Sequence, residues 1–210
     1  MDGLMSLLNS DMGKQLVNGL SNEAGVDTSK AADLIGMAMP LIMAGMKKKA
    51  ANPQTAEGLL NAARSDRHDG SILDNLGSLF SGGVNPEVLQ DGAGILGHVF
   101  GDKEPEVKNA LSQRSGLDAG TIGKTLMTLA PIALGLLGKQ TRQNNISSPN
   151  DLSSMLGSML GGQPGQNRDM ITSLLDADGD GSVLDDVSDM LAGGKNKGGL
   201  AGMLGSLFGK

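Results

Sequence analysis

Five aspartates within eleven residues form the clearest chemical signal in this sequence. Residues 174–187 read LLDADGDGSVLDDV, which puts Asp176, Asp178 and Asp180 at positions 1, 3 and 5 of a loop and Gly181 at position 6. Carboxylates at this spacing converge on one centre, and hard cations such as calcium take six to eight oxygen ligands. The glycine permits the sharp turn that such a loop needs. The spacing predicts a calcium-binding loop of the EF-hand or dockerin type.

The rest of the ligand set departs from that pattern. Position 12, where a bidentate carboxylate is usual, is Val187, whereas Asp185 and Asp186 stand at positions 10 and 11. Either a shortened loop lets Asp186 complete the coordination, or water does. The predicted calcium ligands are Asp176, Asp178, Asp180, Ser182 (through its backbone carbonyl), Asp185 and Asp186, with a dissociation constant of about 10⁻⁵ to 10⁻³ M. The competing interpretation is a solvated acidic turn that caps the next helix.

A second stretch resembles this loop without its full set of carboxylates. Residues 68–76 align with residues 179–187 at an offset of 111. Positions 1 and 3 of this copy are Ser65 and Arg67, so two carboxylates are missing and a cation replaces one of them. The sequence therefore predicts that this copy keeps the turn and binds no ion.

A longer internal similarity organises the chain. Residues 20–48 align without gaps with residues 111–139, giving six identities in 29 positions. Chance would give roughly two at ordinary residue frequencies. The identities include Asp27 with Asp118 and Pro40 with Pro131. This pattern predicts an internal duplication.

Apolar residues recur at helical spacing along the whole chain, and no alternating strand pattern occurs. The predicted fold class is all-α, with two related multi-helix halves made of glycine- and methionine-rich helices. Asp27 and Asp118 are predicted N-caps, Gly25 a C-cap, and Pro40 and Pro131 sites of a kink or restart. Other predicted helices begin at Asn52-Pro53, Asn85-Pro86 and Glu104-Pro105. A further helix is predicted from the apolar stripe over residues 72–80. Loops are predicted at residues 141–150 and 161–167.

Glycine-rich breaks divide the chain into four predicted parts. These are an N-terminal helical repeat (1–83), a second repeat (84–162), the aspartate loop with its flanking helices (163–192), and a linker with an amphipathic tail (193–210). The tail stripe is Leu200, Met203, Leu204, Leu207 and Phe208. It is either a partner-binding helix or a segment that folds back on the core.

Composition excludes several classes of function. A net charge of -6 argues against a nucleic-acid or anionic-membrane partner, and the absence of cysteine excludes thiolate chemistry. The longest apolar runs, Leu34–Met46 and Leu126–Leu137, have 13 and 12 residues, short of the roughly 20 that a membrane span needs. No segment is typical of a signal peptide. We therefore expect a soluble, cytoplasmic protein.

No motif supports an enzyme or a small-molecule substrate. Gly92 to Gly97 matches a dinucleotide fingerprint by letter, but a helix is predicted before it, so close helix packing explains these glycines better. His98 is predicted to be a core or interface residue, and His68 to be solvated. The favoured function is a structural or protein-interaction role, including self-association, with one calcium loop. The alternative is a membrane-active protein that inserts glycine-rich apolar helices.

Several of these motifs together resemble a known family. The segments 69–74 (DGSILD) and 94–101 (GILGHVFG), Pro131 in an apolar helix and the aspartate loop are similar to the bacterial domain of unknown function DUF937. The resemblance covers roughly residues 1–190. It implies a soluble, all-helical bacterial protein and carries no activity over to this chain.

Overall fold

The computed structural model describes residues 10–161 and 165–175, and every regular element in this part of the chain is a helix. The all-α prediction is confirmed for these residues. The predicted helix at 1–8 and all residues after 175 lie outside the described part. The elements are α2 (Asp11–Ala24), α3 (Thr28–Ala51), α4 (Ala56–Arg64), η1 (Asp66–His68), α5 (Ser71–Asp74), α6 (Leu76–Leu79), α7 (Pro86–Phe100), η2 (Gly101–Lys103), α8 (Glu104–Ser115), α9 (Ala119–Gln143), α10 (Pro149–Leu160) and α11 (Gly165–Leu175).

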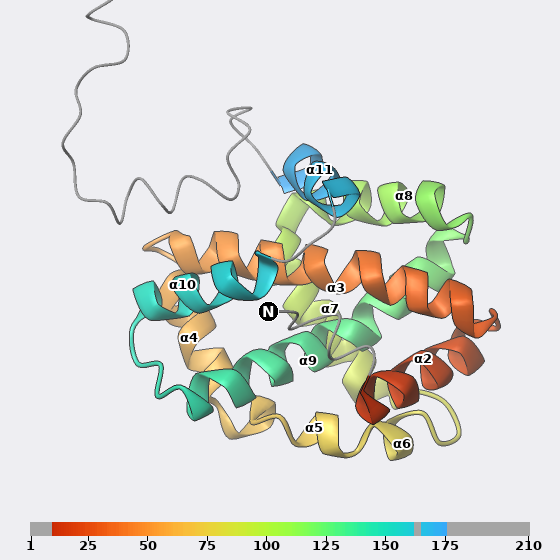
Figure 1. Cartoon of the computed structure of the whole chain (residues 1–210), viewed down its shortest axis with the longest axis horizontal. Coiled ribbons are helices and arrows are strands. Elements are labelled where there is room, and N and C mark those ends of the chain that lie inside the picture. The colour runs from red at the N-terminus through yellow and green to blue at the C-terminus, as the bar shows by residue number, and fades with distance from the viewer. Residues whose placement is uncertain (1–9, 162–164, 176–210) are drawn as a thin grey trace, which may run out of the picture.

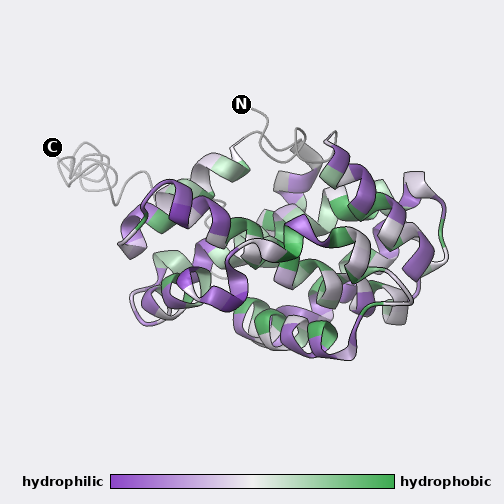
Figure 2. Ribbon diagram, turned by 90° about the horizontal axis from the view of Figure 1, so that it is seen from below, coloured by the Kyte–Doolittle hydropathy of each residue, from purple (hydrophilic) through white to green (hydrophobic). Residues whose placement is uncertain are grey.

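Two long helices, α3 and α9, form the centre of the molecule (Figure 1). Helix α3 buries 14 of its 24 residues and α9 buries 15 of its 25. They pack against each other, while α2, α10 and α11 cover α3, and α4, α5, α7 and α8 cover α9. In Figure 2, hydrophilic residues are frequent in the outer helices and apolar residues are concentrated toward the middle of the molecule. Residues on both sides of position 83 contribute to this one core.

The two central helices begin in the same way. Asp27 and Asp118 are their N-caps, and each carboxylate accepts a hydrogen bond from the backbone N–H three residues later, at 2.8 and 2.9 Å. The preceding helices end at Gly25 and Gly116, whose φ angles are 65° and 70°. The predicted caps at Asp27, Asp118 and Gly25 are confirmed. They define the start of each central helix because they satisfy backbone groups that a helix end leaves open.

The Asp118 cap gives a pH-dependent prediction. The Thr121 hydroxyl and then the Thr121 backbone N–H hold the pKa of Asp118 below its ordinary value. A carboxyl with a lowered pKa stabilises the fold at neutral pH, and this contribution is lost as the pH falls through the folded-state pKa. Asp118→Ala should therefore lower the melting temperature at neutral pH, and its difference from wild type should shrink in acid.

Thermal unfolding followed by circular dichroism at a series of pH values measures this difference. Asp102→Ala removes another exposed carboxylate, in η2, and serves as the control. A difference between Asp118→Ala and wild type that stays constant down to strongly acidic pH would refute the assignment.

Pro40 and Pro131 lie inside continuous helices, so of the predicted kink or restart the restart does not occur, and the kink stays a prediction. A proline inside a helix removes one backbone hydrogen bond and costs about 3 kcal/mol or more. Both prolines are buried in the core. Apolar packing along the rest of these long helices offsets that cost.

Two glycines allow backbones to approach closely. A Cβ atom at Gly92 of α7 would lie 1.8 Å from the Met127 carbonyl oxygen of α9, and one at Gly138 of α9 would lie 1.9 Å from the His68 carbonyl oxygen. The predicted packing role is confirmed for Gly92. It is wrong for Gly94 and Gly97, where an added Cβ would meet nothing within 4 Å.

Three predicted boundaries differ from the structure. The stripe over residues 72–80 is divided into α5 and α6, which meet at Asn75. Helix α9 extends to Gln143 instead of ending before Thr141, and α11 begins at Gly165 within a predicted linker. Helix α4 begins at Ala56, after the turn that contains Pro53.

Candidate metal centre

The predicted calcium loop, with Asp176, Asp178, Asp180, Ser182, Asp185 and Asp186, lies outside the described residues. The helix that leads into it is α11, which ends at Leu175. Met170 and Leu175 are buried and Leu174 packs against the core, so the predicted helix on this side of the loop is confirmed. The residues that would follow the loop, such as Val187, are also outside the described part.

Helix α11 is attached to α3 at both ends. The Asn167 side-chain amide donates to the Gly36 carbonyl oxygen at 3.0 Å, and the Lys48 ammonium donates to the carbonyl oxygen of Leu175. Between these two bonds, Ile171 is buried in the core. In Figure 1, α11 lies on the side of α3 that is away from α9, and it packs against α3. The first predicted ligand, Asp176, therefore directly follows a helix end that is hydrogen-bonded to α3.

Three consecutive lysines, Lys47 to Lys49, lie near the C-terminal end of α3. From the sequence, three cations at a helix C-terminus predict a solvated helix end, but Lys47 is only 4% exposed and its ammonium lies beside Gly157 of α10. Lys48 lies at the C-terminal carbonyl of α11. A cation at a helix C-terminus is favoured by the helix dipole and by the unpaired carbonyls there. The expectation is wrong for Lys47, which is buried, whereas Lys48 is exposed as expected and also donates a hydrogen bond to a carbonyl 127 residues later in the chain.

The second, incomplete loop is fully described. It follows α4, and Gly70 at loop position 6 has φ 98°. The Asp69 carboxylate at position 5 accepts a hydrogen bond from the Ser71 backbone N–H at 2.8 Å. That N–H and then the Ser71 hydroxyl lower the pKa of Asp69. The predicted turn is confirmed, with a helix on each side.

A cation from another helix neutralises the start of this second loop. The Arg142 guanidinium of α9 donates to the carbonyl oxygens of Arg64 and Ser65, each at 3.0 Å, and to the Asp66 carboxylate at 3.2 Å. Loop position 1 is Ser65, so positive charge is already present where the loop begins. Within residues 10–161 and 165–175, no three His, Asp or Glu side chains are grouped so that they could hold a metal.

His68 belongs to a polar cluster that its sequence neighbours do not reveal. Its Nε2 atom lies 3.1 Å from the Asp91 carboxylate of α7, and the two side chains are 11% and 18% exposed. Its Nδ1 atom lies 3.1 Å from the Ser65 hydroxyl, which donates to the Ala62 carbonyl oxygen at 2.8 Å. The expected solvated His68 is wrong, because its partner Asp91 is 23 residues away along the chain.

Ser65, His68 and Asp91 stand in a row, as in a nucleophilic triad. The hydrogen bond of the serine to a helix carbonyl instead indicates a role in ending α4, because that bond directs the hydroxyl proton away from the histidine. His98, the other histidine, is exposed on α7, so the predicted core position is wrong, and the alternative of an interface position stays a prediction.

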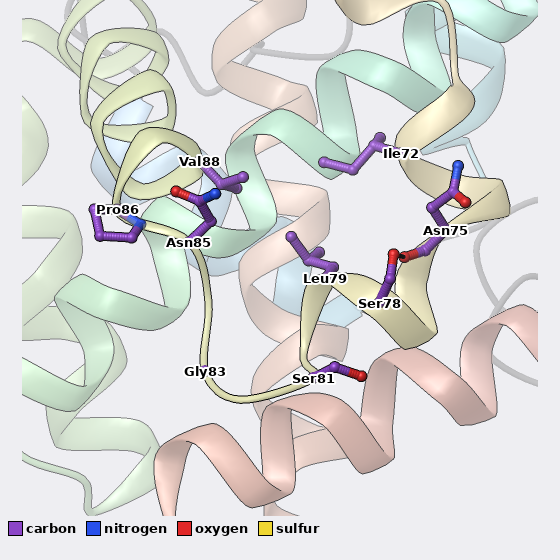
Figure 3. A pocket seen from close by; sticks show the side chains of 9 residues that line it. All are labelled: Ile72, Asn75, Ser78, Leu79, Ser81, Gly83, Asn85, Pro86 and Val88. Atoms are coloured by element: carbon purple, nitrogen blue, oxygen red, sulfur yellow. Dashed lines mark hydrogen bonds between the residues drawn. The ribbon is translucent and has the colours of Figure 1, made fainter.

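A groove of about 510 Å³ lies between α5, α6 and the start of α7 (Figure 3). Its apolar residues include Ile72, Leu79 and Val88, and its rim carries the neutral side chains of Asn75, Ser78, Ser81 and Asn85. These polar groups already bond to nearby backbone: the Ser78 hydroxyl donates to the Asn75 carbonyl oxygen, and the Asn85 side-chain oxygen accepts from the Glu87 N–H. The groove therefore offers shape without a set of polar groups directed at a ligand.

Comparison with protein families gives one match. The model described as a bacterial protein of unknown function, DUF937, matches residues 6–140 and 143–210. The chain belongs to the DUF937 family. The resemblance inferred from the motifs is thereby confirmed. Comparisons of this DUF937 protein with curated proteins and with solved structures gave no match.

One helix of the described DUF937 chain is long and apolar enough to cross a membrane. This helix is α9, and 72% of its most apolar window is buried inside the molecule. The core helix of a soluble protein can be equally long and apolar. The apolarity of α9 is therefore explained either by burial in the core or by a membrane span.

Proposed function

We propose that this DUF937 protein is a non-enzymatic interaction protein that binds one calcium ion through residues 176–186. The proposed ligands are Asp176, Asp178, Asp180, the Ser182 carbonyl, Asp185 and Asp186. Three carboxylates at alternate positions supply the negative charge and the hard oxygen atoms that calcium prefers. Ligand binding to the folded chain would also stabilise it.

The observation that carries this proposal is the folded second loop. Its sequence aligns with the aspartate loop at a fixed offset, and it forms a turn between helices with Gly70 at the position of Gly181. The aspartate loop has carboxylates where the second loop has Ser65 and Arg67. We propose that a turn at Gly181, like the one at Gly70, lets Asp176, Asp178 and Asp180 bind one ion.

The duplication remains part of the proposal. In its support, the Ser21 hydroxyl donates to the Val26 carbonyl oxygen and the equivalent Ser112 hydroxyl donates to that of Leu117. Both bonds join the end of one helix to the turn before a central helix. A common origin of the two halves, 1–83 and 84–162, would explain why both serines make the same hydrogen bond.

We assign the proposed protein interaction to the C-terminal tail. The apolar stripe of α10, which includes Leu152, Leu156 and Leu160, is buried in the core, largely against α3. It is therefore not open to a partner. We propose the stripe from Leu200 to Phe208 as the segment that binds a protein partner or a second copy of this chain.

A calcium titration by calorimetry on the full, chelator-stripped chain tests the ion, with magnesium as the control. The proposal predicts one site that prefers calcium, with a dissociation constant of about 10⁻⁵ to 10⁻³ M. No heat up to millimolar calcium would leave the segment as a capped acidic turn.

The alternative, a membrane-active protein, is favoured only by the apolarity of α9. Pelleting with vesicles of phosphatidylethanolamine and phosphatidylglycerol separates the two functions. An interaction protein should stay in the supernatant, whereas a membrane-inserting chain should sediment with the vesicles.

A further inference from the structure

His68 connects three helices around the second loop. Its carbonyl oxygen lies 1.9 Å from the position that a Cβ atom at Gly138 would take, so the backbone of η1 rests directly on α9. The Nδ1 side of its ring faces the end of α4, and its Nε2 atom lies 3.1 Å from the Asp91 carboxylate of α7. The imidazole is therefore the group through which η1 is held to α7.

Both ring nitrogens of His68 face hydrogen-bond acceptors. On the Nε2 side, an ionised carboxylate such as that of Asp91 only accepts. On the Nδ1 side, the Ala62 carbonyl oxygen at 3.3 Å also only accepts. The Ser65 hydroxyl at 3.1 Å from Nδ1 already donates to that carbonyl, so it offers the ring a lone pair. A neutral imidazole has one N–H and satisfies one side, whereas the protonated ring has two and satisfies both.

The charges around the ring leave Asp91 as its counter-charge. The Arg67 guanidinium lies 3.6 Å from the other Asp91 oxygen, but its side chain is 70% exposed, so water weakens its effect on the ring. On α9, Arg142 pairs with Asp66, and Lys139 pairs with Asp74. The charged side chains on η1 and on the helices packed against it are Asp66, Arg67, Arg64 of α4, Asp91 of α7, and Lys139 and Arg142 of α9.

We infer that His68 is a proton-controlled clasp between η1 and α7. The protonated ring donates to Asp91 on one side and to Ser65 on the other. When the ring loses a proton and keeps its bond to Asp91, Nδ1 faces only oxygen lone pairs, unless Ser65 turns its hydroxyl away from Ala62. One hydrogen bond is lost in either case. Histidine is the side chain that changes its charge between pH 5 and 8, so the clasp tightens in acid and loosens as the pH rises.

The clasp joins the two sides of the groove between α5, α6 and α7. Ile72 of α5 follows His68 by four residues, and Val88 of α7 precedes Asp91 by about one helical turn. Ile72 and Val88 both line the groove (Figure 3). A rise in pH should therefore loosen α5 against α7 and make the apolar surface of the groove more accessible.

Melting temperatures of the full chain at about pH 5 and about pH 8 test the inference. His68→Gln replaces the ring by an amide that can donate to Asp91 and stays neutral at both pH values. The stability that a protonated group adds to the fold is present in acid and is lost as the pH rises. The wild type should therefore exceed His68→Gln by roughly 2–4 °C more at the acidic pH than at the alkaline one, the shift that one hydrogen bond gives in a protein of this size.

Two further variants keep the test decisive. His98→Gln replaces the other histidine, which is exposed on α7, and its difference from wild type should be the same at both pH values. Asp91→Asn removes the counter-charge, so it should reproduce the pH-dependent loss seen in His68→Gln. Circular dichroism shows whether each variant retains the helical fold.

Amide hydrogen exchange of residues 65–76, compared between wild type and His68→Gln at the same pH, measures the loosening itself. Exchange should be slower in the wild type in acid and equal in the two proteins at the alkaline pH. A difference between wild type and His68→Gln that is the same at both pH values would give His68 a purely structural role and overturn the inference. An Asp91→Asn variant whose difference from wild type does not change with pH would overturn it as well.

Discussion

Gly92→Ala should lower the stability of the protein by about 2 kcal/mol or more. The new Cβ would lie 1.8 Å from the Met127 carbonyl oxygen and 2.6 Å from its carbon, so the backbones of α7 and α9 would have to separate. Overpacking typically costs about 1–3 kcal/mol, and a clash with backbone atoms belongs at or above the top of this range; after the gain of about 1 kcal/mol from replacing glycine inside a helix, a net loss of about 2 kcal/mol or more remains. In a chain of this length the melting temperature should fall by roughly 4–8 °C.

Gly94→Ala provides the matched control on the same helix. An added Cβ there meets nothing within 4 Å, so only the gain in helix propensity remains, and the melting temperature should rise slightly. Chemical denaturation of both variants gives the two free energies of unfolding. Equal stabilisation by the two substitutions would show that α7 and α9 do not approach each other as closely as Gly92 and Met127 indicate.

Replacing Asp176, Asp178 and Asp180 together by alanine should abolish calcium binding. These residues supply three of the proposed carboxylate ligands, and calcium is held mainly by such charged oxygen atoms. The dissociation constant should move beyond the millimolar range that calorimetry can follow. The helical fold of residues 10–161 should persist, because the substituted positions follow α11 in the chain and are not part of the described core.

Asp69→Ala separates the two loops. Asp69 occupies position 5 of the second loop and bonds to the Ser71 N–H, so its removal should disturb this turn without changing calcium affinity. If Asp69→Ala weakened binding as much as the triple substitution does, the division into one binding loop and one incomplete loop would be wrong.

Local signals in the sequence predicted the helix ends well. The carboxylates of Asp27 and Asp118 cap the two central helices, and Asn85 with Pro86 begins α7, because capping depends on residues only two or three positions apart. The all-α fold class follows from the apolar periodicity, which long helices show over many turns. These features need no knowledge of the tertiary structure.

Features that depend on distant partners were not predictable in the same way. The partner of His68 is Asp91 on another helix, and the partner of Lys48 is the carbonyl of Leu175, 127 residues later. Helix α9 continues past Thr141 because Thr141 is buried and packing extends the helix beyond its polar end. Tertiary packing determines these hydrogen-bond partners and this helix end, and a single sequence does not show which residues pack together.

The candidate site was predicted from the spacing of its carboxylates. The structure adds two features that bear on this prediction. One is the folded second loop, in which Gly70 forms the turn at the position that aligns with Gly181, although loop positions 1 and 3 are not acidic. The other is the attachment of α11 to α3 through Asn167 and Lys48. Neither the lysine nor the asparagine belongs to any calcium-loop pattern, so sequence reasoning alone did not connect them with the site.

Amide hydrogen exchange of the full chain, with and without saturating calcium, tests the central claim most directly. A calcium ion held by residues 176–186 should slow exchange in that segment and at the adjacent end of α11, where Leu175 meets Lys48. Exchange around the second loop, residues 65–76, should not change. Protection confined to residues 65–76, or no change anywhere at millimolar calcium, would contradict the assignment of the calcium site to the aspartate loop.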